Sequence, residues 1–180
     1  QTNLKAKRGY LIPVAYLWTR TVKCPNPECG ASVPLVRQTW LCKKKGRYIA
    51  FRPIPDHKEK KVKFEVVSVR REKDLGFNPG NFSSRGHTSC FLCGAVVNNN
   101  YVKAESRAAR MNNQLMGVAC IRPGQKGKIY LSSNDLPDLL PSDDLIIERI
   151  NTLCEQTGLI LPKEELTGQI LSQYGMSSFK

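Results

Sequence analysis

The chain has 180 residues, of which 41% are hydrophobic and 24% are charged. These values are ordinary for a globular protein, so they exclude an intrinsically disordered chain and a mini-protein that depends on disulfides. The net charge of +13 is unevenly spread: residues 1–130 contain 25 basic and 7 acidic side chains, and residues 131–180 contain 3 and 8. Such a basic body favours a polyanionic partner, although a solvated basic face or docking on an acidic domain fits the charge equally well.

The first apolar run, LIPVAYLW, begins at Leu11. It is too short for a spanning helix, which needs ~20 residues, and it predicts a buried strand or a short helix. Seven cysteines, an odd number with uneven spacing, are typical of a reducing compartment. We therefore expect a cytoplasmic protein with no membrane partner.

Several later segments have strand character. Residues 33–40 and 47–54 are joined by LCKKKG, whose Gly46 is free to take a positive φ, and this pattern predicts a β-hairpin with a basic turn. In residues 62–70 the alternation of side chains predicts one well-buried face and one mixed face. The stretch GVACIRPGQKGKIYLSS predicts two short strands around a Pro-Gly turn.

A helix is predicted over residues 103–116, and Gly117 is placed to end it. Its apolar positions recur at helical spacing, and a neighbouring stripe of the same helix is basic. The apolar face consists of Ala104, Ala108, Met111 and Leu115, and the basic stripe of Lys103, Arg107 and Arg110.

A second helix is predicted after an acidic linker, NDLPDLLP. Ser142 is its N-cap, Asp143 and Asp144 lie at the positive end of the helix dipole, and Gly158 is placed to end it. The residues expected to face inward are Ile146, Ile150 and Leu153. The last twenty residues look irregular.

Two cysteine pairs, CPNPECG and CFLCG, offer four soft ligands: Cys24, Cys29, Cys90 and Cys93. Each pair is close enough for both thiolates to reach one ion, and together they make the closed tetrahedral set of a structural zinc site. A disulfide is disfavoured by the expected compartment, and a redox C-x-x-C needs a thioredoxin-like βαβ context. A catalytic zinc ion needs an open coordination position, which four cysteines do not leave.

Other reactive or aromatic residues are expected to be structural or solvated. His87, three residues before Cys90, could replace a ligand, but a histidine in a polar loop is more often solvated. The three cysteines without a partner at ligand spacing, Cys42, Cys120 and Cys154, are expected to be buried free thiols. The three aromatic side chains Trp18, Trp40 and Tyr101 are expected in the core rather than on a base-stacking surface.

The order of several blocks resembles the central segment of adenine-specific DNA methylases that contain a zinc ribbon. The blocks are YLWTRTVKCPNPECGASVPLVRQTWLCKKKGR, RGHTSCFLCG, YVKAESRAARMNNQLMGVA, GKIYLSS and QYGMSSF. The resemblance covers nearly the whole chain and implies that Cys24, Cys29, Cys90 and Cys93 bind zinc. It also implies a Rossmann-like methyltransferase core that uses S-adenosylmethionine and an Asp-Pro-Pro-Tyr motif.

That catalytic motif is missing here: the closest approach, Asn78-Pro79-Gly80, lacks the second proline and the aromatic residue. No glycine-rich loop follows a strand to hold a nucleoside cofactor. The chain is therefore expected to be an excised, non-catalytic fragment, with S-adenosylmethionine bound only in the missing part. Its partners would be DNA and the remainder of the methylase chain.

The expected architecture is an α+β fold, a zinc ribbon with an extended antiparallel hairpin and a few helices. Residues 1–132 form the basic domain with the knuckles, and residues 133–180 an acidic linker and helical segment. The DNA phosphate contacts are assigned to Lys43, Lys44, Lys45, Arg47, Arg107 and Arg110. Two alternatives stay open: a zinc-stiffened scaffold that packs on the methylase core, and a ribbon that recruits a protein partner, for instance in phage defence.

Overall fold

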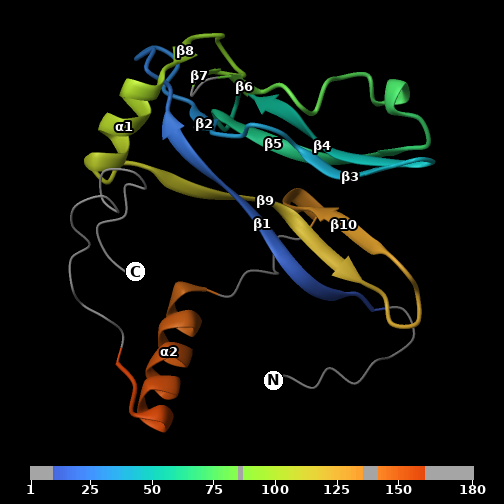
Figure 1. Ribbon diagram of the computed structural model, residues 1–180. Coiled ribbons are helices and arrows are strands. Elements are labelled where there is room, and N and C mark those ends of the chain that lie inside the picture. Colours follow the sequence, from blue (N-terminus) through green and yellow to red (C-terminus); the bar gives the residue numbers. More distant parts are fainter. Residues whose placement is uncertain (1–9, 85–86, 136–141, 161–180) are drawn as a thin grey trace.

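The computed structural model describes residues 10–84, 87–135 and 142–160 and has a mixed α and β architecture with antiparallel sheets (Figure 1). One sheet has the order β10-β9-β1-β2, from Lys128–Ser132, Asn112–Ile121, Ile12–Lys23 and Ser32–Pro34. A second sheet consists of β3 (Trp40–Lys44), β4 (Arg47–Asp56) and β5 (Lys61–Val69). A small third sheet consists of β6 (Ser83–Ser84), β7 (His87–Ser89) and β8 (Val96–Val97). The helical elements are η1 (Glu72–Leu75), α1 (Asn99–Arg107), η2 (Ser133–Asp135) and α2 (Asp143–Thr157).

The predicted basic hairpin is confirmed as β3 and β4, which pair antiparallel around a turn at Lys45 and Gly46. Gly46 has a φ of 78°, as the turn requires. The strand predicted over residues 33–40 is wrong, because this segment passes from one sheet to the other. Val33 pairs with Val22 of β1, whereas Trp40 pairs with Ala50 of β4.

The core lies between the first and second sheets. Phe51 of β4 and Phe64 of β5 are buried and meet edge to face, with ring centroids 6.0 Å apart. Leu17 of β1 and Met116 of β9 pack against this pair from the opposite sheet. The buried face predicted for β5 is confirmed, because Val62 and Phe64 are both fully buried.

Hydrogen bonds between the two sheets fix how they lie on each other. The Ser132 hydroxyl at the end of β10 donates to the Phe64 carbonyl, and the Gln114 side chain of β9 donates to the Val62 carbonyl at 2.6 Å. The Tyr130 hydroxyl of β10 donates to the Leu41 carbonyl of β3 at 3.0 Å. These bonds give polar groups at the interface a partner, and they link β3 and β5 to the first sheet.

The apolar run at Leu11 forms the first half of β1, and the expectation that it is buried is wrong, because five of its eight residues are exposed and the other three are only half-buried. Tyr16 is 44% exposed and Trp18 is 49% exposed. The reason is the face on which these side chains lie: exposure alternates along this part of β1, so Leu17 faces the second sheet while Tyr16 and Trp18 lie on the opposite, uncovered face. Trp18 is therefore a surface residue, while Trp40 and Tyr101 are half-buried.

The helix predicted over residues 103–116 is correct only in its first part. Helix α1 begins after Asn98, whose side chain accepts a hydrogen bond from the Tyr101 amide, and it ends at Arg107. Ala109 takes a positive φ of 53°, and the Arg110 amide donates to the Glu105 carbonyl, a helix-ending pattern that usually uses glycine. The following residues form β9, so Gly117 lies inside a strand and ends no helix.

Helix α2 has the predicted ends: Ser142 caps it by accepting from the Leu145 amide, and Gly158 follows it. The expectation that its apolar residues face inward is wrong, because Ile146 and Leu153 are each 42% exposed. The linker residues 136–141 and the last twenty residues lie outside the described residues. None of the described helices is both long and apolar enough to cross a membrane.

Candidate metal centre

The first cysteine pair lies in a tight knuckle directly after β1. The Cys24 amide donates to the Ala31 carbonyl at 2.7 Å, and the amides of Cys29 and Gly30 both donate to the Asn26 carbonyl at 3.1 Å. Gly30 has a φ of 57°. The turn therefore closes on itself and directs both sulfurs to the same side.

The second pair repeats this scheme between β7 and β8. The Cys90 amide donates to the Ala95 carbonyl at 2.8 Å, and the Gly94 amide donates to the Cys90 carbonyl at 2.9 Å. Gly94 has a φ of 76°. In both knuckles the amide of the first cysteine donates a hydrogen bond to the carbonyl of the residue two positions after the second cysteine. A glycine with positive φ directly follows the second cysteine in each case. The two turns therefore share one geometry.

The two knuckles meet although they lie far apart in the sequence. The Sγ atoms of Cys24 and Cys93 are 3.5 Å apart, and those of Cys29 and Cys90 are 3.9 Å apart. All four Sγ atoms lie within 4.8 Å of one another. All seven cysteines are free thiols, so this cluster is not a pair of disulfides. Four sulfur ligands at this separation can hold one soft metal ion.

The thiols of the cluster differ in pKa. Burial raises the pKa of the Cys24 thiol to about 12, whereas hydrogen bonding by the Ala95 backbone lowers the pKa of Cys93 to about 7. A dication that binds four thiolates must displace the protons that remain on such thiols. Metal affinity at this cluster is therefore expected to rise with pH.

Packing around the knuckles makes the cluster part of a small core. The buried residues are Val22, Cys24, Ala31, Val33, Cys90 and Val97. Helix α1 covers this core with Tyr101 and Val102, and the Tyr101 hydroxyl donates to the Lys23 carbonyl at 3.1 Å. The second sheet reaches the first knuckle through the β4–β5 turn, where the Lys60 carbonyl accepts from the Ser32 amide at 2.8 Å.

Asp56 organises that turn, and this predicts a pH effect on stability. Its carboxylate accepts from the amides of Lys58 and Glu59, both at 3.0 Å, and lies 2.6 Å from the Lys63 ammonium. The ammonium of Lys63 is the main cause that lowers the pKa of Asp56 to about 2. Because the folded pKa lies below the unfolded value of about 3.9, the contribution of Asp56 is present above pH ~4 and is lost as the pH falls through ~2.

We therefore expect Asp56→Asn to lower the free energy of unfolding at neutral pH, and we expect the difference from the unmodified chain to shrink as the pH is lowered from about 5 to about 2. Chemical denaturation of both proteins at a series of pH values measures this difference. Loss of a metal ion in acid affects both proteins alike and cancels in the comparison. A difference that stays constant over this range would contradict the role of the carboxylate.

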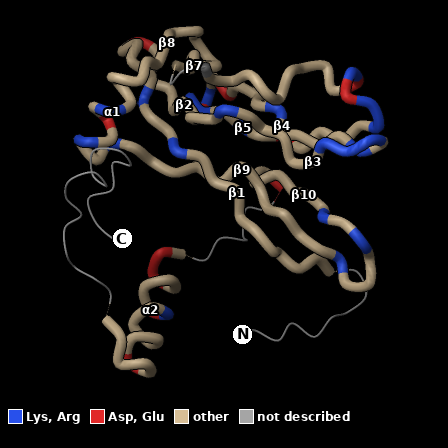
Figure 2. The backbone as a smooth tube through the Cα atoms, viewed as in Figure 1, with Lys and Arg blue, Asp and Glu red and all other residues tan. Residues whose placement is uncertain are grey.

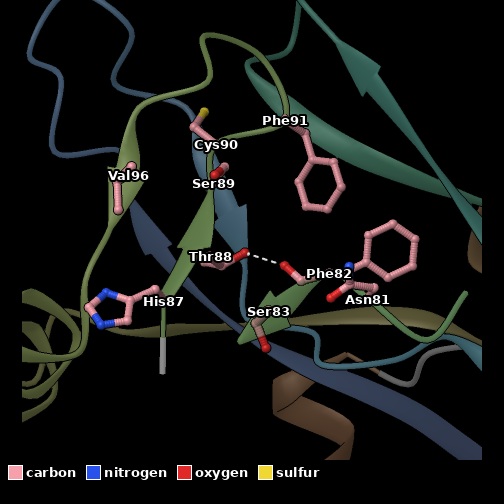
Figure 3. Close-up of a pocket in the computed structure, with 9 residues that line it drawn as sticks. All are labelled: Asn81, Phe82, Ser83, His87, Thr88, Ser89, Cys90, Phe91 and Val96. Atoms are coloured by element: carbon pink, nitrogen blue, oxygen red, sulfur yellow. Dashed lines mark hydrogen bonds between the residues drawn. The ribbon is translucent and has the colours of Figure 1, made fainter. Parts of the chain in front are cut away.

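His87 lies outside the cluster. It is exposed and lines a pocket of about 450 Å³ beside the second knuckle, and Figure 3 shows its ring apart from the sulfur of Cys90. The pocket floor is closed by Phe82 and Phe91, whose ring centroids are 5.9 Å apart, and the Thr88 hydroxyl donates to the Phe82 carbonyl at 2.9 Å. No carboxylate lines this pocket in the described part of the chain.

The remaining cysteines behave differently from one another. Cys120 is buried on β9, as expected for a structural thiol, and burial raises its pKa. Cys42 and Cys154 are only half-buried, so the expectation that they are buried is wrong for these two. Cys42 lies on β3, close to the basic turn, and Cys154 lies on α2.

The structure separates the six candidate DNA contacts into two groups. Lys43, Lys44, Lys45 and Arg47 lie around the β3–β4 turn, whereas Arg107 and Arg110 lie at the end of α1, on the opposite side of the molecule (Figures 1 and 2). They do not form one surface.

Three of these six cations are engaged within the chain. Lys43 lies 2.8 Å from Glu72 and 5.0 Å from the Trp40 ring centroid, Arg47 donates to the Lys128 carbonyl, and Arg110 lies 2.6 Å from Glu105. The other three, Lys44, Lys45 and Arg107, are exposed and have no acidic partner among the described residues.

The contact of Arg47 with Lys128 brings a second basic segment to the hairpin. This segment consists of the β9–β10 loop, residues 122–127, and the first residue of β10; it contains Arg122, Lys126 and Lys128 and no acidic residue. These cations are not among the six candidates that the sequence suggested. Their only signal in the sequence is the local composition RPGQKGK, and their position beside the hairpin depends on tertiary packing.

Scans of the chain against protein-family models, curated proteins and solved structures found no match.

Proposed function

We propose that the chain is a zinc-stabilised, DNA-positioning segment of an adenine-specific DNA methyltransferase. Support for the metal comes from the four sulfurs. A tetrahedral site with Zn–S bonds of ~2.3 Å places its sulfurs ~3.8 Å apart. The separations of 3.5 Å and 3.9 Å in the cluster fit this value. The role of the ion is structural, because four thiolates leave no coordination position for water or substrate.

In this proposal the zinc ion joins the two knuckles as a zinc ribbon. Cys24 and Cys29 are the ligands of the first knuckle, and Cys90 and Cys93 are those of the second. The ion then supplies positive charge that keeps all four thiolates ionised within a small core. The β3–β5 sheet, which lies between the knuckles in sequence, is held against the ribbon by its β4–β5 turn.

The observation that carries the DNA-binding part is the hairpin tip. Lys44 and Lys45 extend from the end of a three-stranded sheet and are exposed without an acidic partner among the described residues. An enzyme that flips a base must also hold the flanking duplex, and exposed cations on a rigid support contact its phosphates. Such contacts position DNA without reading its sequence.

The methyl transfer itself is assigned to a catalytic domain outside these 180 residues, where S-adenosylmethionine would bind. The chain carries no D/N-P-P-Y/F/W motif to perform it. The assignment to a methyltransferase rests on the resemblance of the cysteine knuckles and their flanking blocks to that family.

Charge reversal at the hairpin tip tests the DNA-binding part. We expect Lys44→Glu/Lys45→Glu to weaken binding of the zinc-loaded chain to a short DNA duplex and to reduce the salt dependence, with the slope falling by about 0.9 for each phosphate that is no longer neutralised. Fluorescence anisotropy at two salt concentrations measures both quantities. The matched control is Lys58→Glu/Lys103→Glu, which makes the same change of charge at exposed positions away from the hairpin. Equal binding by the hairpin variant and the unmodified chain would refute the assignment.

A second candidate function, docking on a protein surface, is favoured by the exposed aromatic side chains of β1. Tyr16 and Trp18 lie on the exposed face of β1, which carries no charged residue before Arg20. Half-exposed aromatic residues on such a strand are typical of a protein interface. If the chain fails to bind DNA at low salt, the better proposal is a zinc-stiffened module that packs on the methylase core through this surface.

A further inference from the structure

The β9–β10 loop is a second basic segment, next to the basic turn of the β3–β4 hairpin. These two segments are called the prongs. Arg122, Lys126 and Lys128 are all exposed, and the loop contains no acidic residue. A turn at Pro123 and Gly124 shapes it, with the Gln125 amide donating to the Arg122 carbonyl at 3.1 Å. Exposed cations without neighbouring carboxylates keep their full charge available for an anionic partner.

The loop is attached to the hairpin at its base. The Arg47 guanidinium donates to the Lys128 carbonyl, and Tyr130 donates to the Leu41 carbonyl at 3.0 Å. A Cβ atom at Gly127 would lie 2.8 Å from Nη1 of Arg47, so a larger residue there would make the flexible arginine side chain shift. These contacts join the start of β10 to β3 and to the first residue of β4.

Both segments project at the same end of the molecule, opposite α1 (Figures 1 and 2). The acidic residues at this end are already engaged: Glu72 lies 2.8 Å from Lys43, and Asp74 lies 2.9 Å from Arg71. The net field at this end of the described structure is therefore strongly positive.

The two segments arise from different sheets, β3 and β4 from one and β9 and β10 from the other. Their exposed cations therefore lie on two separate strips of the surface. A duplex offers two phosphate backbones, which border its major groove, so each segment has a backbone to contact.

We propose that the β3–β4 hairpin and the β9–β10 loop form a two-pronged clamp for the phosphate backbones of duplex DNA. Lys44 and Lys45 contact one backbone, and Arg122 and Lys126 contact the other. Arg47 is a positioning residue that joins the prongs. The clamp rests on the proposed DNA-binding function and deepens it, since it adds a second contact surface and specifies a double-stranded ligand.

The test compares the zinc-loaded chain with Arg122→Glu/Lys126→Glu, with the hairpin variant Lys44→Glu/Lys45→Glu and with the control Lys58→Glu/Lys103→Glu. Anisotropy is measured with a duplex of about 20 base pairs and with one of its single strands, at about 50 mM and about 200 mM salt. We expect the loop variant to lose about tenfold or more in duplex affinity and the salt slope to fall by about 1 for each cation removed. Unchanged zinc content and circular dichroism show that each variant is folded.

Each other outcome overturns the clamp in a recognisable way. Loss of binding in the hairpin variant but not in the loop variant refutes the clamp and leaves the proposed function intact. Equal weakening in the loop variant and the control shows that only net charge matters, and equal affinity for the single strand refutes the two-backbone geometry. Absence of duplex binding by the unmodified chain at low salt refutes both proposals.

Discussion

Replacement of Cys24 by serine is expected to remove tightly bound metal from the chain and to lower its stability sharply. A serine hydroxyl does not ionise, so the substitution leaves three thiolates around a buried position that is 5% exposed. Structural zinc contributes about 10–16 kcal/mol of apparent binding free energy in zinc-finger peptides at neutral pH, and loss of one ligand forfeits much of it. Elemental analysis after gel filtration measures the metal, and thermal unfolding measures the stability.

The matched control for this substitution is Cys154→Ser. Cys154 is a half-buried free thiol on α2 and lies outside the cluster, so this variant should keep its metal and its unfolding temperature. A strong chelator should bring the unmodified chain close to the behaviour of Cys24→Ser. If a chelator leaves the thermal unfolding of the unmodified chain unchanged, the cluster does not act as a structural metal site.

Gly117→Ala is expected to lower the free energy of unfolding more than the addition of a methyl group anywhere else in the described core. A Cβ atom at this position would contact the Leu131 carbonyl and lie 2.7 Å from Cζ of Phe51. The carbonyl belongs to the β9–β10 ladder and the ring is 1% exposed, so neither can move away freely. Overpacking of this kind destabilises by about 1–3 kcal/mol or more.

Denaturant unfolding measures this effect, and Gly80→Ala provides the control. Gly80 has no positive φ, and the nearest atom to a Cβ there is the side-chain oxygen of Asn78 at 3.4 Å. We expect Gly80→Ala to change the free energy of unfolding by no more than about 0.5 kcal/mol. Equal unfolding midpoints for the two variants would contradict the close packing of β9 against β4.

The sequence was most informative where a local signal is strong. The turn at Lys45 and Gly46, the N-cap at Ser142 and the pairing of strands around Pro123 and Gly124 all depend on residues close in the chain, and all are confirmed. The cysteine pairs are a local signal as well, although the meeting of the two pairs is a long-range contact. Knuckle spacing predicts that two cysteines face one ion, and the four sulfurs do lie together.

The prediction of a helix over residues 103–116 failed because the helical spacing of apolar residues continues by coincidence past the end of α1. Residues 104–115 have apolar positions at helical spacing, but Met111 lies between α1 and β9, and Leu115 belongs to β9. Alanine rarely takes a left-handed conformation, so nothing in the sequence marks Ala109 as the residue that ends the helix. Pairing of β9 with both β1 and β10 then overrides the local preference.

Features that depend on tertiary arrangement could not be predicted. An apolar strand has the same sequence whether one or both of its faces are covered, so the exposure of Tyr16 and Trp18 could not be predicted. The inclusion of Arg107 and Arg110 with the hairpin lysines reflected composition, which contains no information on distance. The proximity of Arg47 to Lys128 likewise arises from the packing of two sheets.

The two knuckles lie far apart in the chain, so a link between them restricts the freedom of the unfolded chain. The ligands Cys29 and Cys90 are 61 positions apart, and the whole β3–β5 sheet lies between them. An ion that joins them closes a long loop, and a cross-link over this length removes about 4 kcal/mol of conformational entropy from the unfolded chain. The antiparallel sheet inside the loop forms from contacts much closer in sequence, so it can assemble before the loop closes. In the proposed zinc site, the ion would therefore bind last and join the second knuckle to the first after the sheet between them has formed.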